Sequence, residues 1–265
     1  MINDLINIDN AALPYYLLLF VRLSGLFILS PVFGRKNVPV LLKAGFCLLL
    51  TVVLAAAQPA DQTINTDRLL TFVADIFQEL AVGLLLGFLS ILFFSIALMA
   101  GQIIDVEIGL GVGSLFDPQL NTQASVSGIL LNLLMLVYFF VNNGHLRLIR
   151  ILAASVAHVP VGQVHLLSRD VALLAIEQFS LCFSLAVSLM LPVIAMALLT
   201  ETALGMLMRA IPQLNAYMVG IPLKILVGLA VLYLTQPLYI TFCDKVFSSL
   251  FNASEQWILR LGVSQ

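Results

Sequence analysis

The sequence predicts an all-α integral membrane protein, and two observations carry that prediction. Hydrophobic residues make up 61% of the 265 residues and charged residues only 10%, with a mean hydropathy of +1.08. Soluble domains contain roughly 25% charged residues. Residues 80–104 and 178–200 hold no Asp, Glu, Lys, Arg or His, and each run is long enough for a helix to cross about 30 Å of hydrocarbon.

Seven apolar segments follow one another along the chain, and each is expected to be helical. Short polar connections, or connections marked by proline and glycine, separate them without a large soluble domain. We expect one membrane domain over residues 1–265, with N-terminal hairpins over about 1–165 and a C-terminal hairpin over about 166–265. The apolar segments lie at about 11–33, 40–57, 80–104, 126–141, 146–161, 171–200 and 217–243.

Two adjacent segments are short for membrane-spanning helices. Residues 126–141 are mostly apolar, and residues 146–159 number only 14. A helix of that second length is roughly 21 Å long, which is less than the hydrocarbon core requires. Residues 142–145 (Asn-Asn-Gly-His) favour a turn between the two segments. The pattern therefore predicts a helical hairpin that enters the membrane and returns.

The distribution of cations predicts that several helices contact protein rather than lipid. If each main segment crosses once, neither orientation places the Lys and Arg residues of the loops consistently on one side. That outcome conflicts with the positive-inside tendency. Pro192, Pro222 and Pro237 interrupt apolar runs, and each favours a kink whose freed carbonyl needs a neighbouring group. Helices of this kind are expected in an assembly of several subunits.

Six ionisable side chains lie inside apolar runs, where a charge costs about 2.5–3.5 kcal/mol at the bilayer centre. They are expected to pair, to reach the interface or to face water. Asp75 and Glu79 lie four residues apart on one helical face and are expected at a solvated helix end. For Lys224, a structural ion pair or carbonyl cap is favoured over a proton relay. The six are Arg22, Asp75, Glu79, Glu177, Glu201 and Lys224.

A glycine-rich loop is the first candidate for a functional site. It lies within residues 69–146, a stretch of 78 residues without Lys or Arg. Alternating glycines let the backbone adopt positive φ and approach another surface closely. A plug or constriction element over the loop 105–124 and an ordinary surface loop both stay open as interpretations. The candidate plug residues are Gly109, Leu110, Gly111, Val112, Gly113, Leu115, Phe116, Asp117 and Pro118.

No pattern indicates a catalyst, a cofactor or a metal site. The glycines lack the preceding strand and following Lys-Ser/Thr that hold phosphates, so nucleotide binding is not expected. No basic run is present to bind nucleic acid, and no nucleophile elbow or paired-carboxylate site stands out. The chain is therefore not expected to be an enzyme. The residues expected to be ordinary are Cys47, Cys182 and Cys243 as small hydrophobes, and His145, His158 and His165 as loop histidines.

Three stretches together resemble the FliR/SctT family of type III secretion export-gate subunits. They are residues 101–111 (GQIIDVEIGLG), 115–119 (LFDPQ) and 211–228 (IPQLNAYMVGIPLKILVG). The most specific part is the Pro-Gln-x-Asn block followed by Gly-x-Pro-Leu-Lys. The likeness extends over nearly the whole chain and includes the Asn-Gly-His turn at 143–145.

The resemblance implies a non-enzymatic subunit of the flagellar export gate in the bacterial cytoplasmic (inner) membrane, at the flagellar basal body. It implies FliP-like and FliQ-like partners, other flagellar export-apparatus membrane proteins, membrane lipid and exported unfolded flagellar proteins. It implies that the glycine-rich loop enters a central channel as a plug. It assigns no separate role to Asp105 or Glu107. The residues that it suggests for partner contacts are Pro212, Gln213, Asn215, Gly220, Pro222 and Lys224.

A small-solute secondary transporter is the alternative function. In that interpretation, half-helix ends near Pro192 or Pro222 bind an ion or a solute. The sequence offers no convincing pair of matching broken helices in two halves of the chain, so this function ranks second.

Overall fold

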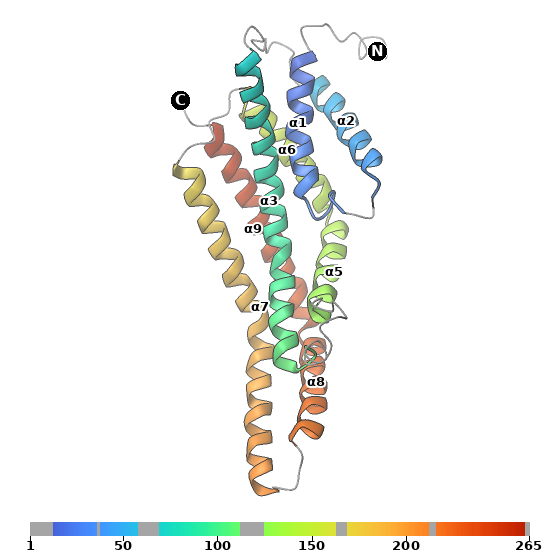
Figure 1. Ribbon diagram of the computed structural model, residues 1–265, viewed down its shortest axis with the longest axis vertical. Coiled ribbons are helices and arrows are strands. Elements are labelled where there is room, and N and C mark those ends of the chain that lie inside the picture. Colours follow the sequence, from blue (N-terminus) through green and yellow to red (C-terminus); the bar gives the residue numbers. More distant parts are fainter. Residues whose placement is uncertain are drawn as a thin grey trace. The chain divides into compact units, whose positions relative to one another are not determined.

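The computed structural model describes residues 13–35, 38–57, 69–111, 125–162, 169–211 and 216–262. Helices are the only regular secondary structure in these ranges, which confirms the all-α prediction (Figure 1). They are α1 (Leu13–Leu29), α2 (Val40–Ala57), α3 (Leu69–Ile108), α5 (Val126–Val141), α6 (Gly144–His158), α7 (Arg169–Ala210), α8 (Ala216–Leu234) and α9 (Gln236–Gly262).

Two of these helices are long and apolar enough to cross a membrane by themselves. They are Leu69–Ile108 of α3 and Val171–Ala210 of α7, each 40 residues long. The pairs α5 with α6 and α8 with α9 would each make one broken span, giving up to four spans in the described part of the chain. The uncharged runs at 80–104 and 178–200 lie inside α3 and α7, so the long apolar helices predicted there are confirmed.

The described residues form two compact units. The first unit draws on 13–92, 143–178 and 249–262, and the second unit on 93–142 and 179–248. The long helices α3, α7 and α9 contribute residues to both. The prediction of one membrane domain over the whole chain stays a prediction.

The breaks between helices coincide with the sequence signals for turns. Between α5 and α6, Asn143 has φ 55°, a left-handed conformation that asparagine tolerates. Between α8 and α9, the helical path bends by 60° at Thr235. Pro237 is the second residue of α9, where its missing N–H needs no helical partner. Helices α7 and α8 continue through Pro192 and Pro222.

Glycines bring α1 and α3 into direct backbone contact in the first unit. A methyl group placed on Gly83 would lie 2.0 Å from the carbonyl oxygen of Arg22, and one on Gly25 would lie 2.7 Å from that of Leu80. Small residues at such crossings allow helices to pack closely in lipid. Helix α2 packs beside α1 (Figure 1), with the rings of Phe27 and Phe46 5.7 Å apart.

Aromatic side chains from three helices form the core of the second unit. The ring centroid of Phe94 on α3 lies 5.4 Å from Phe139 on α5 and 5.7 Å from Phe247 on α9. The buried hydroxyl of Tyr239 on α9 donates to the carbonyl of Leu131 on α5 at 2.6 Å. These contacts join α3, α5 and α9. The three cysteines are all buried and free, as small hydrophobic residues would be.

Candidate functional site: the neck of the glycine-rich loop

The glycine-rich loop begins with a residue that has a specific backbone requirement. Gly109 is the first residue after α3 and has φ +86°, a conformation that glycine adopts without steric cost. The N–H of Gly111 then donates to the carbonyl of Asp105 at 3.1 Å, which closes the end of the helix. The positive φ expected from the glycine pattern is confirmed at Gly109.

The carboxylate of Asp105 joins the two ends of the loop. It is 5% exposed, accepts a hydrogen bond from Ser125 Oγ at 2.7 Å, and accepts from the N–H of Ser127 at 3.2 Å. Ser125 is the N-cap residue of α5, and its Oγ accepts from the N–H of Gly128 at 2.8 Å. A carboxylate at a helix N-terminus is favoured by the positive end of the helix dipole. Asp105 therefore holds the last turn of α3 against the first turn of α5.

One helical turn before Asp105, the two backbones touch. A methyl group placed on Gly101 would lie 2.1 Å from the Cα of Gly128, so no side chain fits between α3 and α5 there. We call Gly101, Asp105, Ser125, Ser127 and Gly128 the neck. Its five residues fix where the loop starts and ends.

Helix α8 packs against the α3 side of the neck. A methyl group on Gly228 would lie only 2.3 Å from Cγ2 of Ile108, so the Ile108 side chain occupies the space that this glycine leaves. Gly109 lies beside α8 as well, because a methyl group there would be 3.6 Å from Cγ2 of Ile221. The contacts bring described residues of two stretches that carry the family resemblance, 101–111 and 211–228, next to each other.

The predicted site residues fall into two groups. Gly109, Leu110 and Gly111 follow α3, while Gly220, Pro222 and Lys224 lie on α8. The contact between Gly109 and Ile221 brings these two sets into proximity. The others lie outside the described residues: Val112, Gly113, Leu115, Phe116, Asp117, Pro118, Pro212, Gln213 and Asn215.

Lys224 forms an ion pair with Glu201, which joins α8 to α7. Their side chains are 20% and 48% exposed. The interpretation of Lys224 as half of a structural pair is confirmed. Its role in contacts with partner subunits stays a prediction.

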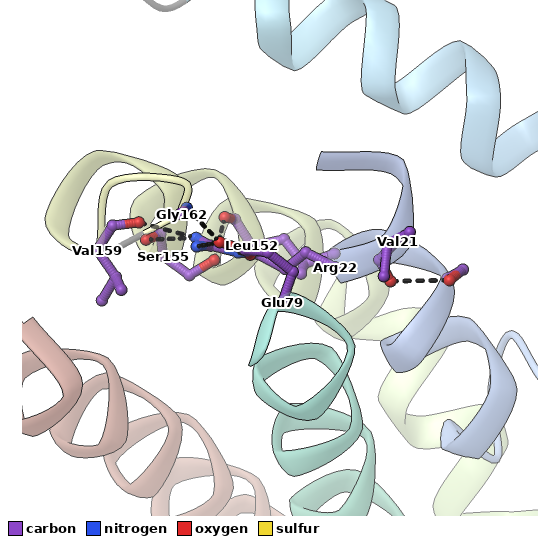
Figure 2. A network of polar contacts seen from close by, with 8 residues as sticks. Val21, Arg22, Glu79, Leu152, Ser155, Val159 and Gly162 are labelled. Carbon is purple, nitrogen blue, oxygen red and sulfur yellow. Dashed lines mark hydrogen bonds and ion pairs between the residues drawn. The ribbon is translucent and has the colours of Figure 1, made fainter. Parts of the chain in front are cut away.

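A second polar network lies in the first unit and is buried (Figure 2). Arg22 and Glu79 pair through two contacts, Nε to Oε2 at 2.5 Å and Nη2 to Oε1 at 3.0 Å. Nη1 of Arg22 donates to the carbonyls of Ser155 and Val159 at 3.1 and 3.0 Å, and Gly162 N donates to Glu79 Oε1 at 2.8 Å. Arg22 thus caps the C-terminus of α6 while Glu79 holds the turn that follows.

The expectation of a solvated helix end at Asp75 and Glu79 is wrong for Glu79. Its side chain is 0% exposed and so is that of Arg22. The close contact of α1 with α3 at Gly25 and Gly83 places the arginine beside the carboxylate. Tertiary pairing overrides the local preference of a carboxylate for water, and the pair serves to fix three helices.

Two features of the site were missed by sequence reasoning. No role was expected for Asp105, although its acidic side chain precedes the loop and a Ser-x-x-Gly cap follows it. The Arg22–Glu79 pair had a signal as well, since each is an isolated charge of opposite sign in an apolar run. Within the described ranges, no three His, Cys, Asp or Glu side chains gather in a way that would hold a metal ion.

Comparison with known proteins identifies the family. The family "Bacterial export proteins, family 1" matches residues 13–250. The flagellar biosynthetic protein FliR of Bacillus subtilis (strain 168) is 29% identical over 253 residues, which cover 95% of this chain and 97% of the relative. FliR of Escherichia coli (strain K12) is 31% identical, with 88% of each chain covered.

Similarity also reaches a type III secretion protein. The Yop proteins translocation protein T of Yersinia pestis is 30% identical over 226 residues, covering 84% of this chain and 85% of the relative. With a family match over residues 13–250 and relatives aligned along most of its length, the chain belongs to the bacterial export proteins, family 1.

Proposed function

We propose that this chain acts in the flagellar type III protein-export gate as a non-enzymatic subunit whose residues 109–118 close the export conduit. Membership in the export family, together with FliR relatives along most of the chain, supports the gate role. The helices α3 and α7 support a membrane-embedded position.

The single observation that carries the closing role is the neck. The hydrogen bond between Asp105 and Ser125 holds the two ends of the loop together. The close backbone contact of Gly101 with Gly128 leaves no space between α3 and α5. Residues 112–124 therefore have a fixed base. Such a loop suits a plug that leaves a conduit and returns to the same place.

We propose that FliP-like and FliQ-like subunits cover much of this chain, in the inner membrane at the flagellar basal body. In the apolar 18-residue stretch of α7 that could span a membrane, only 28% is buried, against 61% in the corresponding stretch of α3. Large apolar side chains such as Leu199 and Met206 are 62% and 69% exposed. Apolar surface of that extent requires lipid or partner helices. Unfolded flagellar proteins are the proposed cargo.

The transporter alternative is not favoured. The matching family is described as bacterial export proteins, and relatives along most of the chain are a flagellar biosynthetic protein and a translocation protein. We prefer the flagellar branch of the family to the injectisome branch because residues 220–228 of α8 resemble the flagellar sequences.

Crosslinking tests the closing role directly. A Val112→Cys variant, assembled with its partner subunits, should form a disulfide or crosslink with a stalled export substrate that carries a cysteine. Val141→Cys, at a position that is 72% exposed at the end of α5, serves as the control and should not crosslink. As a positive control, a cysteine in a partner subunit that crosslinks to the substrate shows that substrate occupies the conduit. If that control crosslinks and Val112→Cys does not, the proposal is overturned.

A further inference from the structure

Helices α6 and α9 enclose a basic groove in the first unit that the export role does not use. Its cavity is about 400 Å³, within the range of roughly 300–1,000 Å³ that small-molecule sites occupy. Arg147, Arg150 and His158 line it from α6, and Glu255, Ile258 and Leu259 from α9. The α6 residues share one helical face, since they recur at spacings close to a helical turn.

Among the described residues, no carboxylate forms an ion pair with either arginine. Within the described residues, the ion pairs are Arg22 with Glu79 and Lys224 with Glu201, and neither Arg147 nor Arg150 takes part. Glu255 lies in the same groove without forming an ion pair with them. The groove therefore keeps an excess of about one positive charge, which matches a phosphate diester. The whole chain has only 12 Lys and Arg residues, so two in one groove are a marked concentration.

One guanidinium is held in place. Arg147 lies over the ring of Phe251, with its Cζ 4.4 Å from the ring centroid. Stacking fixes the plane of a guanidinium and leaves the N–H groups at its edge free to donate. Planar N–H edges match the oxygens of a phosphate group, and arginine binds such oxygens in pairs.

His158 is already engaged with the backbone through one ring nitrogen. Its Nδ1 lies 2.9 Å from the carbonyl oxygen of Ala154. A carbonyl only accepts, so the ring nitrogen donates and the proton of the neutral ring resides on Nδ1. The guanidiniums of Arg147 and Arg150 are the permanently charged donors of the groove.

The groove is bordered by apolar side chains, as a lipid would require. Ile151 and Ile258 are buried at its base, whereas Leu259 is 52% exposed at its edge. Leu146, the residue before Arg147, is 45% exposed as well. An inorganic anion would gain nothing from these side chains, whereas an acyl chain would lie against them.

We propose that the basic groove binds the phosphate of an anionic phospholipid, with Arg147 and Arg150 on the phosphate and Leu259 along the acyl chain. Basic pockets between helices are the usual sites for anionic headgroups, and a cation near a membrane surface contributes roughly fivefold to binding. The site is independent of the plug, so it holds whether or not residues 109–118 close the conduit.

Native mass spectrometry of the full chain, purified with its partner subunits in detergent, tests the proposal. The probes are dioleoylphosphatidylglycerol and dioleoylphosphatidylcholine, added in equal amounts. We expect phosphatidylglycerol to be retained preferentially. The preference should fall by roughly tenfold or more in the double variant Arg147→Gln/Arg150→Gln and persist in Arg260→Gln, an exposed arginine on α9 outside the groove.

Two further arms keep the test decisive. Glu255→Gln removes the one carboxylate that lines the groove and should raise retention of phosphatidylglycerol. Because only a folded variant can bind more lipid, this gain also shows that a substitution in the groove leaves the fold intact. Inorganic phosphate at millimolar concentration should compete weakly, because it lacks the acyl chain. Equal retention of the two lipids, full competition by phosphate, or capture only of an acidic segment of a partner subunit would each overturn the assignment.

Discussion

Ser125 Oγ donates a 2.7 Å hydrogen bond to the buried carboxylate of Asp105, across 20 residues of sequence. The bond joins the end of α3 to the residue before α5, and the segment between them is the glycine-rich loop. If residues 109–118 act as the proposed plug, one carboxylate holds its base, so removal of that carboxylate tests the proposal directly.

Asp105→Asn should loosen the neck. The amide keeps one acceptor oxygen but loses the charge that favours the N-terminus of α5, at a cost of about 1 kcal/mol. We expect increased permeability of the membrane to small solutes and reduced swimming. Dye uptake and the diameter of swimming halos measure the two effects. Glu107→Gln makes the same chemical change two residues away and should leave both at wild-type level.

Gly101→Ala should prevent the close contact of α3 with α5. The new methyl group would lie 2.1 Å from Gly128 Cα and 2.2 Å from its nitrogen, so the helices must separate. The yield of co-purified complex should fall. Gly205→Ala is the matched control, since nothing lies within 4 Å of a methyl group there. That change in mid-helix should be neutral or stabilising by about 0.5–1 kcal/mol, and equal losses from both variants would contradict the role of the neck contact.

Gly111→Glu tests the loop without disturbing the fold. A methyl group at Gly111 would have no neighbour closer than 3.8 Å, so a larger side chain can leave the helix end intact. We expect normal co-purification of partners together with an obstructed or leaking channel, measured by motility and small-molecule permeability. Gly111→Ala should behave as the wild type. Normal sealing and normal motility in Gly111→Glu would refute the plug.

Breaking the Arg22–Glu79 pair should destabilise the first unit strongly. Replacing either partner leaves an unpaired buried charge, at a cost of about 3–5 kcal/mol. The double variant Arg22→Met/Glu79→Leu removes both charges and should lose less than either single variant. Thermal unfolding of the purified complex measures the three values. A double variant at least as unstable as the sum of the singles would show that the pair is not coupled.

Lys224→Ala should impair assembly more than stability. An ion pair as exposed as Lys224 with Glu201 contributes only about 0–1 kcal/mol to folding. Co-purification of partner subunits is the measurement. The exchanged variant Lys224→Glu/Glu201→Lys restores the pair in reverse, so it should regain assembly if the pair itself matters. If both Lys224→Ala and the exchanged variant lose co-purification of partner subunits, Lys224 itself contacts a partner subunit.

Sequence patterns predicted the elements and turns of this protein well. Long uncharged runs gave α3 and α7, the Asn-Asn-Gly-His stretch gave the break at Asn143, and an isolated lysine gave the pair at Lys224. Each of these signals is local, because hydrophobic length and turn chemistry act over a few residues.

The missed features all depend on contacts between distant segments. Glu79 looked like a solvated carboxylate beside Asp75, and only the contact of Gly25 with α3 brings Arg22 to it. Asp105 looked like one acid near a loop, and its role follows from the return of the chain at Ser125. A single sequence holds the residues of such pairs but not the distances between them.

The buried guanidinium of Arg22 also constrains how the protein is made. Its carboxylate partner follows 57 residues later, and the carbonyls that it caps follow 133 and 137 residues later. A nascent α1 released alone into lipid would carry an unmatched charge, at a cost of about 2.5–3.5 kcal/mol. The helix should therefore wait at the insertion machinery until α3 and α6 have been synthesised, so that integration proceeds as a group rather than one helix at a time.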